Sequence, residues 1–328
     1  MKLLIVVHHH LDLWNVPAWF GQRLAAEFPQ LNIFERNSYE GVEEYLRDSE
    51  VIFTLSLRPE QFALCEKLRW IHTPTAAVHQ FQFPQFIESD VVLTNSTEVH
   101  GPVVAEHVIA LIFALAKKIP QAAILQQKHV WGQEAMWNQR PHMREIAGAT
   151  LGLIGVGSIG RRVAQMASGL GMRVIAMREH VEKGSPEGVE RVFPASQIDD
   201  LLRQSDYVVL AAPLIAATEK LINAERLAVM KREACLINVG RGPLVDESAL
   251  LEALRTRRIG GAALDVFDRE PLPADSPLWG LDNLLITPHT AGLTEKLWHR
   301  HYEHFSSNLR RYFSHEPLQY VVDKRKGY

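Results

Sequence analysis

Short apolar runs alternate with amphipathic segments along almost the whole chain. Such alternation is typical of parallel β-strands joined by helices that cover both faces of a sheet. In the first part, strands are predicted at 2–7, 32–35, 51–57, 71–73 and 91–94. Helices are predicted at 17–28, 41–47 and 64–70. We therefore expect a small α/β domain, flavodoxin-like in topology, over residues 1–98.

The alternation resumes after a polar crossing at 95–102 and a long apolar helix expected at 103–119. Near the start of that helix, Glu106 and His107 fit either a partly buried polar pair or a place lining a cleft. A loop is expected at 131–141. Further strands are predicted at 151–154, 172–177, 192–193, 207–212, 235–239, 261–266 and 284–287, with helices at 201–205 and 247–256.

A last helix, predicted at 294–313, should return to the first domain because the second sheet is already full. The expected fold class is therefore α/β, with two Rossmann-like domains built on parallel sheets. We expect residues 1–98 plus 293–328 to form the first domain, and residues 99–292 to form the second domain.

Charge and composition narrow the classes of function. With 35 basic and 38 acidic residues the net charge is −3, so nothing favours a nucleic acid or an anionic membrane as partner. Two cysteines, Cys65 and Cys235, are too few for a disulfide scaffold and favour a reducing, cytoplasmic setting. The first apolar run lacks the basic region and cleavage site of a secretion signal, and it predicts a strand.

No metal site is expected, although histidines gather at two places. His8, His9 and His10 are adjacent on an extended chain, so their side chains point to opposite faces and converge poorly on one ion. In the last helix only His301 and His304 share a face, and no carboxylate or cysteine pattern completes a site. The pattern therefore predicts a solvated or packing role for these two histidines.

A glycine turn between a strand and a helix carries the first functional signal. Gly155, Gly157 and Gly160 form a GxGxxG pattern after an apolar strand and at the start of an amphipathic helix. Gly155 would allow the tight turn, Gly157 the approach of a pyrophosphate, and Gly160 close packing of helix on strand. The turn predicts a dinucleotide-binding domain, and the alternative is a plain βαβ unit without a ligand.

The end of the next strand bears on which dinucleotide binds. An acidic side chain here hydrogen-bonds the ribose of NAD, whereas an arginine accommodates the 2′-phosphate of NADP. Arg178 stands at this strand end, followed by Glu179, which a shift of one residue would present instead. We expect NADP(H) to be favoured over NAD(H).

Three further strand ends carry an arginine, a carboxylate and a histidine. Arg241 follows one strand, Glu270 lies in the segment after the next, and His289 follows the last. An arginine can bind the carboxylate of a 2-oxo acid and polarise its carbonyl. A histidine held by a glutamate can donate a proton to that carbonyl. Taken singly, the three also fit a surface ion pair, a turn carboxylate and a loop histidine.

The runs GVGSIG at 155–160, NVGRG at 238–242, DVFDREPLP at 265–273 and PHTAG at 288–292 resemble the D-isomer-specific 2-hydroxyacid dehydrogenase family over essentially the whole chain. The resemblance implies that Arg241, Glu270 and His289 are catalytic, and that Asp265 contacts the nicotinamide side of the cofactor. It also implies a homodimer, because residues 99–117 resemble the helix that packs between subunits in this family. The cofactor-binding positions expected on this basis are Gly155, Gly157, Ser158, Ile159, Gly160, Arg178, Pro213, Val239, Gly240, Asp265 and His289.

Two departures from the family pattern affect specificity. In the expected substrate loop, Ala77 replaces a glycine and His79 an acid, so Ala76 and Ala77 would bind substrate without easy access to a positive φ. Arg178 replaces the usual aspartate. Together the two departures make the chain resemble the glyoxylate and hydroxypyruvate reductases of the family. Arg241 is expected as a further ligand of the substrate.

Two other activities stay open on the same scaffold. Formate or phosphite oxidation is one, although formate dehydrogenases of the family carry glutamine where this chain has Glu270. A dinucleotide-sensing interaction protein, as among the family's corepressors, is the other, because such relatives retain the three catalytic residues. The sequence does not specify the 2-hydroxy acid or the direction of the reaction in the cell.

Overall fold

The chain folds into two α/β units in the computed structural model, which describes residues 1–327 apart from the side chain of Lys183. Residues 1–100 and 294–327 form unit 1, and residues 101–293 form unit 2. The first crossing between the units therefore lies two residues later than predicted, and the second crossing lies one residue later. Two parallel-sheet α/β units confirm the expected fold class.

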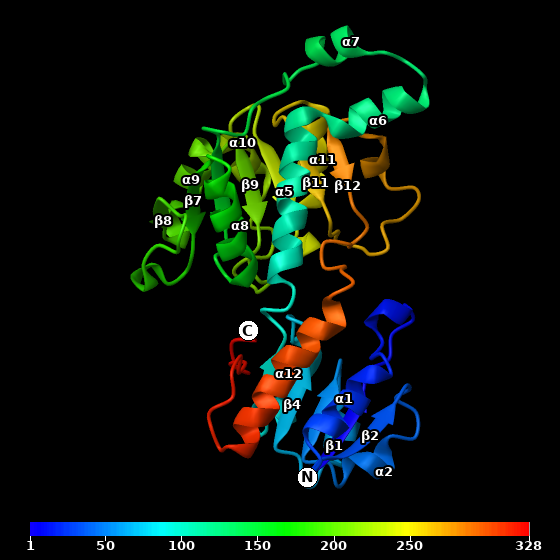
Figure 1. Cartoon of the computed structure of the whole chain (residues 1–328). Helices are drawn as coiled ribbons and strands as arrows, with labels where there is room; N and C mark the ends of the chain where they lie inside the picture. Colours follow the sequence, from blue (N-terminus) through cyan, green and yellow to red (C-terminus); the bar gives the residue numbers. More distant parts are fainter. Residues whose placement is uncertain (328) are drawn as a thin grey trace. The chain divides into compact units, whose positions relative to one another are not determined.

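Unit 1 is built on a five-stranded parallel sheet with the order β2-β1-β3-β4-β5, the flavodoxin-like order (Figure 1). Its strands are β1 (Lys2–Val6), β2 (Asn32–Arg36), β3 (Val51–Thr54), β4 (Trp70–Thr73) and β5 (Val92–Asn95). Its helices are α1 (Trp19–Glu27), α2 (Glu43–Leu46), α3 (Pro59–Phe62), α4 (Pro84–Ile87) and α12 (Leu297–Phe313), with 3-10 turns η1 (Asp12–Trp14) and η2 (His79–Phe81). Side chains alternate along β1, so Leu3 and Ile5 face one core and Leu4 and Val6 the other.

The last helix belongs to unit 1, as predicted. Its buried face carries Tyr302, Phe305 and Leu309, which join Phe20 and Trp70 in one hydrophobic core. Because these aromatic rings fill the face of the sheet that α1 leaves open, the segment after residue 293 completes this unit.

His301 and His304 of α12 pack inside unit 1. His301 is 1% exposed, and its Nδ1 lies 3.2 Å from the Ser96 hydroxyl. The same hydroxyl lies 3.2 Å from Nε2 of the buried His72. Burial lowers the pKa of His72 and His301 well below the ordinary histidine value, and that of His304 to about 4. All three are therefore neutral near pH 7, and the packing alternative predicted for His301 and His304 is the one observed.

The helix predicted at 64–70 is wrong. The helix at this point is α3, which begins earlier, at Pro59, where a fixed φ and a missing N–H suit the first helical position. The Arg58 N–H donates to Oε1 of Gln61 and closes this N-terminus. Leu64 and Leu68 still pack in the core, but from an irregular segment, which is why their spacing resembled a helix.

Unit 2 is built on a seven-stranded parallel sheet with the order β12-β11-β10-β9-β6-β7-β8. Its strands are β6 (Thr150–Ile154), β7 (Arg173–Met177), β8 (Arg191–Phe193), β9 (Tyr207–Leu210), β10 (Cys235–Asn238), β11 (Gly261–Leu264) and β12 (Leu284–Ile286). Its helices are α5 (Gly101–Lys117), α6 (Ile119–Gln127), α7 (Gln133–Asn138), α8 (Ser158–Gly169), α9 (Ile198–Gln204), α10 (Ala224–Val229) and α11 (Glu247–Arg255), with 3-10 turns η3 (Val181–Lys183), η4 (Ala195–Gln197), η5 (Gly242–Leu244) and η6 (Pro277–Gly280). Helices α5 and α8 cover one face, and α9, α10 and α11 the other. The strand order reverses between β6 and β9, and in such sheets ligands bind beyond the carboxyl ends of the strands at this point.

The long apolar helix differs from its prediction at both ends. It begins at Gly101 and ends at Lys117, because Lys118 adopts a left-handed conformation with φ 53°. The predicted loop at 131–141 contains α7, and α6 precedes it, so an arm of two helices projects from the unit (Figure 1). Within residues 1–327 no single helix has both the length and the apolar composition to cross a membrane, whereas α5 and α6 meet these criteria only as a pair bent by 66°.

Candidate active site

The residues predicted to carry chemistry in unit 2 lie along one edge of its sheet. All pairs in this sheet are parallel, so the carboxyl ends of its strands meet at the same edge. In strand order, that edge carries His289 after β12, Asp265 after β11, Val239, Gly240 and Arg241 after β10, Pro213 after β9, the glycine turn after β6 and Arg178 after β7.

The glycine turn has the geometry of a phosphate cradle. Gly155 has φ 98°, and a Cβ there would lie 2.7 Å from the Ala211 carbonyl oxygen. A Cβ on Gly160 would lie 2.1 Å from the Gly155 oxygen, so only glycine lets α8 approach the strand. A Cβ on Gly157 would meet nothing within 4 Å. The open space at Gly157, at the N-terminus of α8, is where backbone N–H groups and the helix dipole suit a pyrophosphate.

Arg178 follows β7 directly and is partly exposed. Its Nη1 donates to the Gly184 carbonyl at 3.2 Å, an exposed contact that a phosphate could replace. On the other side of β6, the Pro213 carbonyl accepts the Thr218 hydroxyl at 2.7 Å. The structure thus brings a guanidinium to the strand end where the sequence predicts the ribose of the cofactor.

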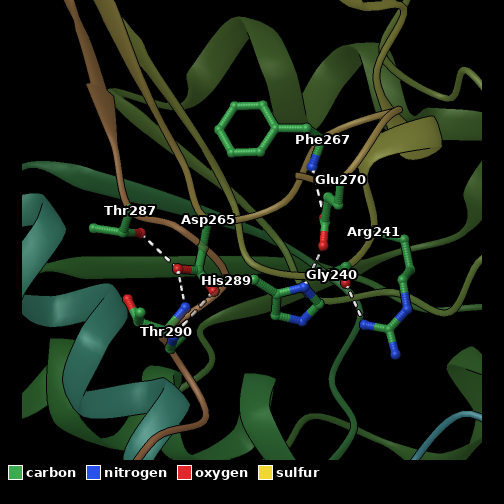
Figure 2. Close-up of polar contacts among 9 residues, drawn as sticks. Gly240, Arg241, Asp265, Phe267, Glu270, Thr287, His289 and Thr290 are labelled. Atoms are coloured by element: carbon green, nitrogen blue, oxygen red, sulfur yellow. Dashed lines mark hydrogen bonds and ion pairs between the residues drawn. The ribbon is translucent and has the colours of Figure 1, made fainter. Parts of the chain in front are cut away.

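His289 and Glu270 form the pair that the sequence predicts, as Figure 2 shows. Nδ1 of His289 lies 2.5 Å from Oε2 of Glu270. The other carboxylate oxygen accepts the Phe267 N–H at 2.9 Å, so the glutamate is oriented from within its own turn. The His289 side chain is 52% exposed, and Nε2 is the ring nitrogen left for a ligand.

The backbone of His289 is held in an unusual conformation. Its φ is 53°, in the left-handed region that non-glycine residues rarely adopt, at a cost of about 1–3 kcal/mol. Its N–H donates to the carbonyl oxygens of Asp265 at 2.9 Å and Thr287 at 3.0 Å. The surrounding segment therefore fixes the direction in which the imidazole points.

Asp265 ties the histidine segment to the sheet. It is 1% exposed, and its Oδ1 accepts the Thr287 hydroxyl at 2.6 Å and the Thr290 N–H at 2.9 Å. Its Oδ2 accepts the Ala291 N–H at 3.0 Å. A buried carboxylate with three donors is well compensated for its desolvation. Asp265 thus fixes the ends of the turn that carries His289 (Figure 2).

Arg241 is largely buried beside the same pair. Its Nη1 donates to the Gly240 carbonyl at 2.6 Å. Burial lowers the pKa of the guanidinium and the charge of Glu270 raises it, which places the two groups within electrostatic reach. Because arginine keeps its charge under all ordinary conditions, the site holds a fixed cation.

The two glycines around Arg241 are required by close packing and not by backbone conformation. Neither has a positive φ, and Arg241 itself is extended, so conformational freedom is not the reason. A Cβ on Gly242 would lie 2.0 Å from the Phe267 carbonyl carbon, and one on Gly240 would lie 2.7 Å from the Leu244 side chain. Glycine at 242 therefore lets the arginine segment contact the backbone of the glutamate segment.

Two residues that orient the site received no role from the sequence. Asn238 brackets the arginine segment, since its Oδ1 accepts the Gly240 N–H at 3.0 Å and its Nδ2 donates to the Arg241 carbonyl at 2.9 Å. Thr287 contacts Asp265 from the last strand end. The signal that could have found them was their position, since Asn238 ends β10 and Thr287 lies between the end of β12 and Pro288.

The predicted substrate loop lies in unit 1, between β4 and β5. The Asn95 amide donates to the Ala76 carbonyl at 2.9 Å, and the Thr75 hydroxyl donates to the Ala77 carbonyl at 2.6 Å. Ala77 reaches this arrangement without a positive φ. A role for the two alanines in binding substrate stays a prediction. Within residues 1–327 no group of three or more histidine, cysteine or acidic side chains could hold a metal ion.

Comparison with known proteins shows the family to which the chain is similar. The sequence profile described as "D-isomer specific 2-hydroxyacid dehydrogenase, NAD binding domain" matches residues 109–291. A D-3-phosphoglycerate dehydrogenase of Methanocaldococcus jannaschii is 33% identical over 84% of this chain, which spans about half of that protein, 52%. A glyoxylate reductase of Korarchaeum cryptofilum is 32% identical over 92% of this chain and 86% of its own.

A solved structure of a similar protein covers both units. The NADPH-dependent glyoxylate/hydroxypyruvate reductase of Sinorhizobium meliloti, in complex with NADP and sulfate, is 27% identical, with a TM-score of 0.83 over 100% of both chains. The profile match extends over more than half of this chain, and relatives above 30% identity extend over most of it. The chain therefore belongs to the D-isomer specific 2-hydroxyacid dehydrogenase family, whose members are NAD(P)-dependent oxidoreductases.

Proposed function

We propose that the protein reduces a small 2-oxo acid such as glyoxylate or hydroxypyruvate with NADPH, and oxidises the corresponding D-2-hydroxy acid in reverse. The observation that carries this proposal is the contact of 2.5 Å between His289 and Glu270 within electrostatic reach of Arg241. The three residues supply a proton donor, its orienting carboxylate and a cation for the substrate carboxylate.

His289 is the acid in this proposal. Glu270 accepts the Nδ1–H, which fixes the orientation of the ring and leaves Nε2 as the atom that carries the transferred proton. In the direction of reduction, Nε2 gives its proton to the carbonyl oxygen of the substrate. In the direction of oxidation, the neutral ring takes the hydroxyl proton back.

Arg241 binds and polarises the substrate. Its planar fork of donors matches a carboxylate, and a second N–H can point to the neighbouring carbonyl oxygen. Because the side chain is largely buried, less water competes for those donors than at the surface. The positive charge also stabilises the negative charge that develops on the carbonyl oxygen during reduction.

The cofactor residues fit a nicotinamide dinucleotide. The N-terminus of α8 would hold the pyrophosphate in the open space at Gly157, and Arg178 the 2′-phosphate. A carboxylate has about four acceptor positions, and Asp265 uses three, so its Oδ2 has room for one donor from the nicotinamide side. When bound, the nicotinamide supplies or receives the hydride.

A turnover assay tests the proposed function. Purified protein with NADPH is offered glyoxylate, hydroxypyruvate, pyruvate and phenylpyruvate in separate reactions. We expect oxidation of NADPH with at least one of the two small acids, glyoxylate or hydroxypyruvate. Tight binding of NADPH with no turnover of any acid would contradict the proposal and favour a dinucleotide-sensing interaction protein.

Replacing Arg178 by aspartate is expected to shift cofactor preference toward NADH. Loss of a charge-assisted contact to the 2′-phosphate should lower the ratio of kcat/KM for NADPH to that for NADH by about 10- to 100-fold. The matched control is Arg173→Asp at the other end of β7, which makes the same change of charge where no phosphate is expected. An unchanged ratio in Arg178→Asp would assign the ribose contact to Glu179 instead.

We propose that the protein is a homodimer that uses the arm of α6 and α7. Large apolar side chains are exposed there, namely Ile119, Ile124, Val130, Trp131 at 92% and Trp137 at 60%. Exposed apolar groups gathered on one projecting arm favour a protein partner, and the family resemblance favours a second copy.

Replacing Trp131 by serine is expected to raise the dissociation constant of the dimer by about tenfold or more, as truncation of a central tryptophan does at interfaces. Trp279→Ser is the control, because this tryptophan is 52% exposed and lies outside the arm. Sedimentation velocity over a range of concentrations measures the change. A wild-type protein that stays monomeric throughout would contradict the dimer.

The proposed setting is the cytoplasm, with no nucleic acid or membrane as partner. Cys65 and Cys235 are both unpaired, and burial raises the pKa of their thiols to about 12 and about 11. Unpaired, protonated thiols suit a reducing compartment. The near balance of charge supports the absence of polyanionic partners.

A further inference from the structure

A histidine of α5 contacts the segment that carries His289. Nε2 of His107 lies 3.1 Å from the Thr287 hydroxyl oxygen and 3.7 Å from Oδ1 of Asp265. The two contacting residues are 180 positions apart in the chain, and the His107 side chain is 21% exposed. The helix that covers one face of the sheet therefore contributes a polar side chain to the edge where the candidate site lies.

The chemistry of the three groups fixes the direction of each hydrogen bond. An ionised carboxylate only accepts, so the single hydroxyl proton of Thr287 is donated to Asp265 at 2.6 Å. The Thr287 oxygen is then an acceptor for His107, whose Nε2 must carry the proton. The order of donation is His107 to Thr287 to Asp265, and each bond polarises the next.

The same carboxylate holds the turn around His289. Oδ1 accepts the Thr290 N–H and Oδ2 the Ala291 N–H, while the Asp265 carbonyl accepts the His289 N–H. His289 needs this support, because its φ of 53° is unfavourable for a residue with a side chain. Without the hydroxyl of Thr287, Oδ1 would keep one donor fewer, and the carboxylate would be less constrained.

We infer that His107 and Thr287 are positioning residues for His289: through Asp265 they keep its backbone left-handed and its imidazole against Glu270. This role rests on the proposed function, in which His289 is the acid. It differs from a purely structural role, because α5 is already anchored in the core of unit 2 by Val108, Ile112 and other apolar residues. Loss of the polar contacts should thus affect the histidine turn rather than the fold.

Four single variants test the inference. Thr287→Val and His107→Phe keep shape and remove the hydroxyl or the N–H, whereas Thr287→Ser and His107→Gln keep a donor at nearly the same place. Thr256→Val is the matched control, because its hydroxyl only donates to the Glu252 carbonyl at an exposed helix end. Two readouts are measured on each: hydrogen exchange of the segment 287–292 without added ligand, and kcat and KM with NADPH and glyoxylate.

We expect exchange in 287–292 to be about tenfold faster in Thr287→Val and His107→Phe, the size of effect that one lost hydrogen bond to a charged group produces. Exchange at β6 in the same samples should not change. We expect kcat to fall about tenfold because proton transfer is the affected step, while KM for NADPH changes by less than about twofold because the proposed phosphate contacts at Gly157 and Arg178 are untouched. Thr287→Ser and His107→Gln should restore both readouts.

The double variant shows whether both residues act through one route. If they do, His107→Phe combined with Thr287→Val should be no more than about twofold worse than Thr287→Val alone. The inference would be overturned if the effects of the two substitutions multiplied in the double variant. It would also be overturned if both single variants kept the wild-type exchange rate and kcat. A wild-type protein without turnover would contradict the proposed function alone, because the exchange measurement still decides whether His107 and Thr287 hold the turn.

Discussion

Replacing His289 by alanine is expected to lower kcat for the reduction of glyoxylate by about 10²- to 10⁴-fold, the range that a positioned general acid contributes. Glu270 is poorly placed to substitute for it, because its two oxygens are engaged with the Phe267 N–H and with the histidine itself. The affinity for NADPH should persist, since the pyrophosphate would be held at the glycine turn. Stopped-flow measurement of single turnovers gives the rate, and fluorescence titration the affinity.

The control for this experiment is His315→Ala. His315 also has a left-handed backbone, with φ 55°, and it is exposed at the end of α12. It therefore reports what the loss of a side chain at such a φ does by itself. Turnover at the wild-type rate in His289→Ala would remove this residue from the mechanism. A comparable fall in His315→Ala would indicate damage to folding instead.

Replacing Arg241 by lysine is expected to lower kcat/KM for the 2-oxo acid by about 10²- to 10³-fold although the charge is kept. Lysine presents a point charge, whereas the guanidinium offers parallel donors to a carboxylate and a further donor to the carbonyl. The extended backbone of Arg241 and the contact of its Nη1 with the Gly240 carbonyl set that fork in one direction. Steady-state kinetics over a range of glyoxylate concentrations measures the change, with KM for NADPH expected to stay close to wild type.

Arg257→Lys is the matched control for the arginine. Arg257 also makes a two-pronged contact, through Nη2, to both carboxylate oxygens of Asp282, but away from the candidate site. Its replacement should leave kcat/KM unchanged within about twofold, because an exposed ion pair contributes little. If Arg241→Lys behaved like this control, the arginine would not bind the substrate carboxylate.

The sequence predicts the sheets well because the strands are buried on both faces. Continuous apolar runs such as 51–54 and 207–210 have no competing interpretation in an alternating α/β pattern. The glycine turn was predictable because its pattern is local: the structure shows a steric reason for Gly155 and for Gly160, and open space at Gly157. The sequence also predicted that one site contains Arg241, Glu270 and His289, because each follows a different strand of one parallel sheet.

Other features depend on contacts that are distant in sequence. The segment 64–70 carries apolar residues at helical spacing, yet the helix begins earlier, at Pro59. Residues 64–69 then pack against the core as an irregular segment. Gly242 is required because the backbone of Phe267 passes against it, which no local pattern shows. The contact of His107 with Thr287 joins a helix to a strand end far along the chain, so the sequence left two interpretations open.

The most direct test is a crystal structure with NADP⁺ and oxamate, an analogue of a 2-oxo acid that is not reduced. The proposed chemistry predicts that the oxamate carboxylate accepts hydrogen bonds from the guanidinium of Arg241. Its amide carbonyl oxygen should lie within hydrogen-bond distance of Nε2 of His289, while Nδ1 of His289 keeps its contact with Glu270. Oxamate bound away from both residues, or an imidazole that has left Glu270 and points away from the analogue, would contradict it.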